Sequence, residues 1–197
     1  ESSWLEAWQA LITQQPDVKV NWLIVPRHPQ RVTEVESLLQ SGGLRVSRRS
    51  SWSPEGPNLC SDLSAENKHP TSVVLLGDSL GEMALYYSLA DVALLGGSFE
   101  KLGGQNLIEA AACACPIVMG PHTFNFSEAS EAAQNSGAAQ RAPNMAEAVR
   151  LAVEIVLNKQ VQQKRAHQAA QFAQQHGGAT ERTVLAVQEL LNSIRGD

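Results

Sequence analysis

Residues that could bind an anionic ligand gather in the stretch from Val92 to Phe126. An apolar segment at 92–95 is followed by glycine pairs at 96–97 and 103–104, and then by a helical pattern that begins near Asn106. Glycines let the backbone turn sharply and bring N–H groups close to a ligand, and a helix N-terminus carries about half a positive charge. The stretch therefore predicts an anion site, most often for a phosphate, although tight turning alone would also explain the glycines.

Three further turns place polar or glycine residues where an apolar segment stops. They lie at 26–29, 77–82 and 120–126. Ligands of open parallel sheets bind beyond the carboxyl ends of the strands. We therefore expect these turns and the 96–106 turn to line one site.

Two of these turns carry charged candidates. Arg27 is suited to phosphate, because guanidinium presents a planar fork that matches phosphate oxygens, and a solvated surface arginine is the alternative. Gly81 would permit close approach of a ligand. Glu82 either contacts that ligand or caps the following helix, since Ser79 and Glu82 have the spacing of a capping box.

The helix after Asn106 carries a second carboxylate. Glu109 lies three residues further on, so both side chains can reach the same ligand. A carboxylate here suits the hydroxyls of a ribose, and an exposed helix glutamate is the alternative. His28 and His122 lie in turns on the same expected edge, where each either contacts the ligand or is structural.

Composition excludes several classes of protein. The chain has 197 residues, of which 43% are hydrophobic and 18% charged, as in a soluble globular domain. A net charge of -5 argues against nucleic acid, and the basic cluster at 45–49 is too small to change this. Cys60, Cys113 and Cys115 form neither a disulfide framework nor a metal-ligand pattern, so no metal site is expected.

Known catalytic motifs are also missing from the sequence. It contains no G-x-S-x-G elbow, no Walker loop and no G-x-G-x-x-G fingerprint. No apolar run approaches the roughly 18 residues of a membrane span. The chain opens on Glu1 directly into a helical pattern, so we expect a fragment or domain whose first strand lies upstream.

The hydrophobic pattern alternates helices with short strands. Helices are expected at 3–15, 32–40, 79–89, from 106, and at 127–135, 145–157, 160–175 and 179–194. Strands are expected at 18–25, 45–50, 72–76, 92–95, 117–119 and 138–141, with a long loop at 51–71. This order, without hairpin signals, predicts an α/β fold: a Rossmann-like doubly wound parallel sheet flanked by helices, with additional C-terminal helices packed on its flank.

Four motifs resemble those of a known family. They read VPRHP at 25–29, GDSLGEM at 77–83, GGS at 96–98 with GGQNLIEAA at 103–111, and GPHTFNF at 120–126. In this order they resemble the C-terminal half of the 3-deoxy-D-manno-octulosonic acid (Kdo) transferases, which are glycosyltransferases of the GT-B fold. The similarity extends more loosely to nearly the whole chain.

The resemblance implies that residues 1–197 form the domain that binds the donor CMP-Kdo, without a cofactor. It assigns contacts with CMP to Pro26, Arg27, Leu80, Gly81, Glu82, Asn106, Leu107, Ile108 and Glu109. Residues expected to line the cleft are His28, Ser98, Gly104, Gln105, His122 and Asn125.

The resemblance also implies what lies outside this chain. A missing N-terminal domain would bind the lipid A precursor, contact the membrane and supply the catalytic carboxylate, so no catalytic residue is expected here. The full-length protein would act at the cytoplasmic face of the bacterial inner membrane. Two alternatives stay open: a GT-B domain for a UDP or GDP sugar, and a non-catalytic nucleotide-binding module that docks a partner through its terminal helices.

Overall fold

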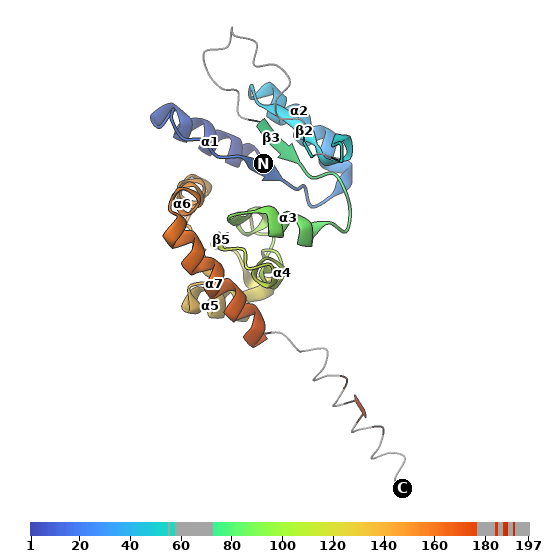
Figure 1. Ribbon diagram of the computed structural model, residues 1–197, viewed down its shortest axis with the longest axis vertical. Helices are drawn as coiled ribbons and strands as arrows, with labels where there is room; N and C mark the ends of the chain where they lie inside the picture. Colours follow the sequence, from blue (N-terminus) through green and yellow to red (C-terminus); the bar gives the residue numbers. More distant parts are fainter. Residues whose placement is uncertain (55, 58–72, 177–183, 185–186, 189–190, 192–197) are drawn as a thin grey trace.

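Short parallel strands and surrounding helices build the chain (Figure 1). The computed structural model describes residues 1–54, 56–57, 73–176, 184, 187–188 and 191. In Figure 1, α1 lies beside the first sheet, and α3 lies between this sheet and α4. Most of the expected helix at 179–194, most of the expected loop at 51–71 and Cys60 lie outside the described residues.

The first sheet contains three strands in the order β1-β3-β2, all parallel. Its elements are α1 (Ser2–Gln14), β1 (Trp22–Ile24), α2 (Val32–Ser41), β2 (Arg45–Arg48) and β3 (Val73–Leu76). Trp22 is paired with Val74 and Arg45 with Val73. The strand expected at 18–25 is shorter than predicted, because only residues 22–24 pair with β3.

The second sheet also contains three parallel strands, in the order β4-β5-β6. Its elements are β4 (Ala93–Leu95), α4 (Leu107–Ala112), β5 (Ile117–Met119), α5 (Ser127–Ser136) and β6 (Ala139–Arg141). A helix, α3 (Met83–Leu89), connects the two sheets. The expected parallel α/β architecture is confirmed, with the strands of the described residues divided between two sheets.

Two C-terminal helices pack on this framework, as predicted. α6 (Met145–Leu157) contacts β4, β5 and α1, and α7 (Lys159–His176) contacts α4 and α5. Asn144 begins α6 by accepting a hydrogen bond from the backbone N–H of Glu147 at 2.9 Å. This cap satisfies a donor that the first turn of a helix leaves unpaired.

An aromatic cluster anchors α1 to the first sheet. The rings of Trp4 and Trp8 contact Trp22 edge to face, at centroid distances of 5.2 and 5.6 Å. The same core includes Val149 and Val153 of α6. Since α6 also packs on β4 and β5, one helix joins the cores of both sheets.

The two described cysteines, Cys113 and Cys115, contact the packed interior of this fold. Cys115 is buried, and burial raises the pKa of its thiol to about 12, as expected of a small hydrophobic residue. Cys113 is only half-buried, and its thiol donates to the carbonyl oxygen of Ala84 at 3.6 Å. This contact ties the end of α4 to α3.

Candidate functional site

The turns beyond the carboxyl ends of the strands contact one another within each of the two sheets. The turn after β1 lies against the turn after β3, because a Cβ atom on Gly77 would lie 3.0 Å from Val25 and from the ring of Tyr86. The backbone N–H of Gly77 also donates to the carbonyl of Ile24 at 2.8 Å. The two predicted ligand turns at 26–29 and 77–82 are therefore neighbours.

The turn after β2 joins the same edge. It forms a short helix, η2 (Arg49–Ser51), and the Nη2 atom of Arg49 donates to Oε1 of Glu82 at 2.9 Å. Ser50 donates its backbone N–H and its hydroxyl to the two carboxylate oxygens of Asp78, at 2.9 and 2.6 Å. The sequence analysis missed Arg49 as part of the site, because it placed the basic cluster at 45–49 within an expected strand, whereas β2 ends at Arg48.

Three side chains hold the carboxylate of Glu82. Oε1 accepts from Arg49, and Oε2 accepts from the hydroxyl of Ser79 and from that of Tyr86, the latter at 3.3 Å. The hydrogen bond from Ser79 lowers the pKa of Glu82, and the charge of Arg49 adds to this effect. The group is therefore a carboxylate near neutral pH.

The predicted capping box at Ser79 is wrong. Helix α3 begins at Met83 with Glu82, not Ser79, at its N-cap position, and no side chain caps its first turn. Gly81 has a backbone φ of +78°, which a right-handed helix does not tolerate, so the helix starts beyond it. The hydroxyl of Ser79 bonds the Glu82 side chain instead of a backbone N–H.

Asn106 starts helix α4, as predicted. Its Oδ1 accepts from the backbone N–H of Ile108 at 3.1 Å, and its Nδ2 donates to Oε1 of Glu109 at 3.0 Å. Glu109 is exposed, whereas the side chain of Leu107 is buried in the core. The polar pair therefore faces solvent on the ligand edge, and Leu107 can offer a ligand only its backbone.

Helices α3 and α4 lie side by side. Tyr87 of α3 packs against the α4 core. Burial, followed by the charge of Glu109, raises the pKa of Tyr87 to about 12. Glu82 immediately precedes α3 and Glu109 lies in the first turn of α4, so adjacent helices carry the two carboxylates.

Ser98 joins the turns after β4 and β5. Its buried hydroxyl accepts from the backbone N–H of Gly120 at 2.6 Å and donates to the carbonyl of Leu95 at 2.5 Å. Its carbonyl accepts from the backbone N–H of His122 at 2.9 Å. The buried residue Ser98 therefore joins the two turns that are predicted to line the cleft.

A second set of contacts fixes the 120–126 turn. Gly103 has a φ of +86°, its carbonyl accepts from the backbone N–H of Asn125 at 3.1 Å, and Asn125 Nδ2 donates to the carbonyl of Leu102 at 3.2 Å. Gly104 packs on the backbone of Thr123. The glycine pair thus permits close packing of one turn on the next.

Arg141 is a further residue that the sequence analysis missed. It stands at the end of β6, and its Nη1 donates to the carbonyl of Gly120 at 2.7 Å and to Oγ1 of Thr123 at 3.2 Å. An arginine at the end of an expected strand was the only signal. Its bonds connect the end of β6 to the 120–126 turn.

The other predicted residues are divided between surface and interior. Arg27 and His28 are exposed beside the buried Pro26, and Arg27 has no hydrogen bond or ion pair with another described residue. The side chain of Leu80 is 80% exposed. Gln105 is half-buried and accepts from the backbone N–H of Gly97 at 3.3 Å.

This arrangement is suited to binding a nucleotide. Arg27 offers a guanidinium to a phosphate, and Glu82 with Glu109 offers acceptors to hydroxyl or amino groups. Within the described ranges no group of three or more His, Cys, Asp or Glu residues could hold a metal ion. No described helix is long and apolar enough to cross a membrane.

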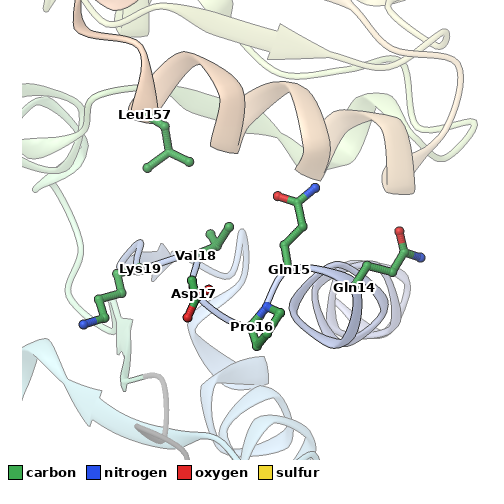
Figure 2. A pocket seen from close by; sticks show the side chains of 7 residues that line it. All are labelled: Gln14, Gln15, Pro16, Asp17, Val18, Lys19 and Leu157. Carbon is green, nitrogen blue, oxygen red and sulfur yellow. The ribbon is translucent and has the colours of Figure 1, made fainter.

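An open hollow lies at the opposite ends of the strands (Figure 2). It is bounded by the end of α1, the segment that leads into β1, and Leu157 at the end of α6. Figure 2 shows its side chains spread around the rim, with Asp17 and Lys19 turned outward. It does not include any residue of the predicted site.

Comparisons with known proteins agree with the predicted resemblance. No protein-family model matches the chain. It is 45% identical over 170 residues to the 3-deoxy-D-manno-octulosonic acid transferase of Bordetella pertussis, covering 86% of this chain and 37% of that protein. It is 34% identical over 179 residues to the enzyme of the same name from Haemophilus influenzae, covering 90% and 38%. The chain thus spans little more than a third of these curated relatives.

One solved structure is similar to this chain over most of the length of both proteins. It is the crystal structure of the C-terminal CMP-Kdo binding domain of WaaA from Acinetobacter baumannii. The TM-score is 0.70 at 28% sequence identity, and the similarity covers 88% of this chain and 82% of that one. The likeness therefore extends beyond the four motifs to the fold.

Proposed function

The chain belongs to the 3-deoxy-D-manno-octulosonic acid (Kdo) transferase family, and we propose that it is the domain that binds the nucleotide-sugar donor, CMP-Kdo. The observation that carries the proposal is the match to a domain described as binding CMP-Kdo. The two groups of contacting turns support it, because they carry cationic and acceptor groups at the carboxyl ends of the strands of both sheets.

In this proposal different side chains of the site bind different parts of the donor. Arg27 binds the phosphate of CMP and stabilises the charge that this leaving group gains as the bond to the sugar breaks. Asn106 and Glu109 bind the ribose hydroxyls. The turn at 120–126 faces the sugar, and the positive charge of Arg27 allows binding without a metal ion or organic cofactor.

The rest of the reaction belongs to polypeptide outside residues 1–197. We infer that this part binds the lipid A precursor, supplies the catalytic carboxylate and contacts the membrane at the cytoplasmic face of the bacterial inner membrane. The chain spans little more than a third of its relatives, which leaves room for such a domain. Residues 1–197 alone should bind the donor nucleotide and transfer no sugar.

Calorimetric titration of the 197-residue chain tests the proposal. CMP should bind more tightly than UDP, UMP, GDP or GMP. Tighter binding of a uridine or guanosine nucleotide would indicate that the donor is another nucleotide sugar. A folded chain that binds none of them would instead favour a module that docks a partner and has no nucleotide site.

A further inference from the structure

The ion pair between Arg49 and Glu82 suggests how the site orients its ligand. We propose that Arg49 is a positioning residue, which aims the carboxylate of Glu82 at the nucleoside part of the donor. This inference rests on the proposed function. Its evidence comes from the contacts of η2 with the turn after β3, which connect residues 33 positions apart.

Arg49 is fixed from two sides. Its Nη2 atom lies 2.9 Å from Oε1 of Glu82, and its guanidinium carbon lies 5.3 Å from the centre of the Trp52 ring. The indole N–H of Trp52 donates to the hydroxyl of Ser47 at 3.1 Å, which fixes the ring in turn. A guanidinium over an aromatic face is held by its charge and its flat shape, so Arg49 has a defined orientation.

Counting acceptor positions shows what Glu82 can still bind. A carboxylate has about four lone-pair positions. Arg49 uses one on Oε1 and Ser79 uses one on Oε2, whereas the single proton of the Tyr86 hydroxyl is directed to Oε2 or to the hydroxyl of Ser79. Oε1, the oxygen that Arg49 holds, therefore keeps a free position among the described contacts.

The remaining position selects the chemistry of the ligand. It can accept only from an N–H or O–H group, and a carboxylate repels the oxygens of a phosphate. A cytidine nucleotide offers ribose hydroxyls and an amino group on its base. Glu82 therefore binds the nucleoside, and Arg49 determines the direction in which it does so.

The burial of Arg49 supports an indirect role. Its Nε atom is buried without a hydrogen-bond partner among the described residues, so this N–H is not offered to a ligand in solution. The side chain as a whole is 31% exposed and that of Glu82 is 29% exposed. The two side chains are about equally exposed, and the hydrogen bond to Oε1 of Glu82 lets Arg49 act through that carboxylate.

A double-mutant cycle tests the proposal with CMP and cytidine as probes. Arg49→Met and Glu82→Gln should each weaken binding of both probes about tenfold, the usual effect of losing one charge-assisted hydrogen bond. The double variant should also lose about tenfold, because both changes remove one coupled unit. Arg49→Lys, which keeps the charge, should recover part of the loss. Arg150→Met is the matched control, since Arg150 pairs with glutamates on α6 away from the site.

Two results would overturn the proposal. A hundredfold loss in the double variant would mean that the two residues act independently. A loss confined to CMP in Arg49→Met, with cytidine unaffected, would make Arg49 a direct phosphate ligand.

A separate measurement keeps this inference distinguishable from the proposed function. The charged and titratable groups that face Glu82 in the described structure are Arg49 and Tyr86. Carboxyl titration by nuclear magnetic resonance in the free chain should show a higher pKa for Glu82 in Arg49→Met than in the wild type. If the wild type binds no CMP and this pKa rises, the proposed function fails and the positioning of Glu82 stands. An unchanged pKa refutes the positioning itself.

Discussion

Gly103→Ala should destabilise the chain by disturbing the contact between two site turns. The backbone at Gly103 has a φ of +86°, and an added Cβ atom would lie 2.2 Å from Nδ2 of Asn125. The left-handed conformation costs an L-residue about 1–2 kcal/mol. Displacing Asn125 also breaks its 3.2 Å hydrogen bond to the carbonyl of Leu102, worth about 0.5–1.5 kcal/mol. The expected loss is therefore about 1.5–3.5 kcal/mol.

Urea and thermal unfolding measure this loss directly. At about 2–4 °C per kcal/mol for a chain of this size, the melting temperature should fall by roughly 3–14 °C. Gly96→Ala is the matched control, because Gly96 has no positive φ and an added Cβ atom would meet nothing within 4 Å. The control should stay within about 0.5 kcal/mol of the wild type.

A second variant separates the two causes of the loss. In Gly103→Ala with Asn125→Ala the steric clash is gone, and the left-handed conformation remains. The added alanine should then cost only about 1–2 kcal/mol relative to Asn125→Ala alone. If Gly103→Ala is as stable as Gly96→Ala, the turns at 96–106 and 120–126 do not pack as described, and the argument for their shared edge fails.

Three other predictions concern the charged groups of the site. Arg27→Ala should weaken CMP binding by about 1.5–3 kcal/mol, the value of a charge-assisted hydrogen bond, and a calorimetric change well under about 0.5 kcal/mol would remove Arg27 from the site. Glu109→Ala should weaken binding of CMP and spare inorganic phosphate, since its proposed partner is the ribose; equal losses would contradict that role. The pKa of Glu82 is lowered in the fold, so its stabilising effect is complete above the ordinary glutamate pKa and is lost as the pH falls through its lowered value. The difference in unfolding free energy between wild type and Glu82→Gln should therefore shrink between pH 7 and pH 3, and a difference that is constant with pH would refute the ionised assignment.

Local sequence determined the elements whose contacts lie within a few residues. The strand at 117–119 and the helix at 145–157 were predicted with their observed bounds, because an apolar run and an amphipathic pattern are strong local signals. Asn106 caps α4 through bonds two and three residues away. The four turns of the site could also be predicted, since each lies where an apolar strand gives way to polar and glycine residues.

Tertiary contacts decided where these elements end and which side chains meet. β1 is limited to residues 22–24 because strand length depends on its partner β3, a segment about 50 positions away. The pairs Arg49–Glu82 and Ser98–Gly120 join residues 33 and 22 positions apart. A local pattern predicts hydrogen bonds that close within a turn of helix, whereas a long-range contact depends on how whole elements pack. The sequence thus located the turns of the proposed donor site, and only the fold showed which side chains fix them in place.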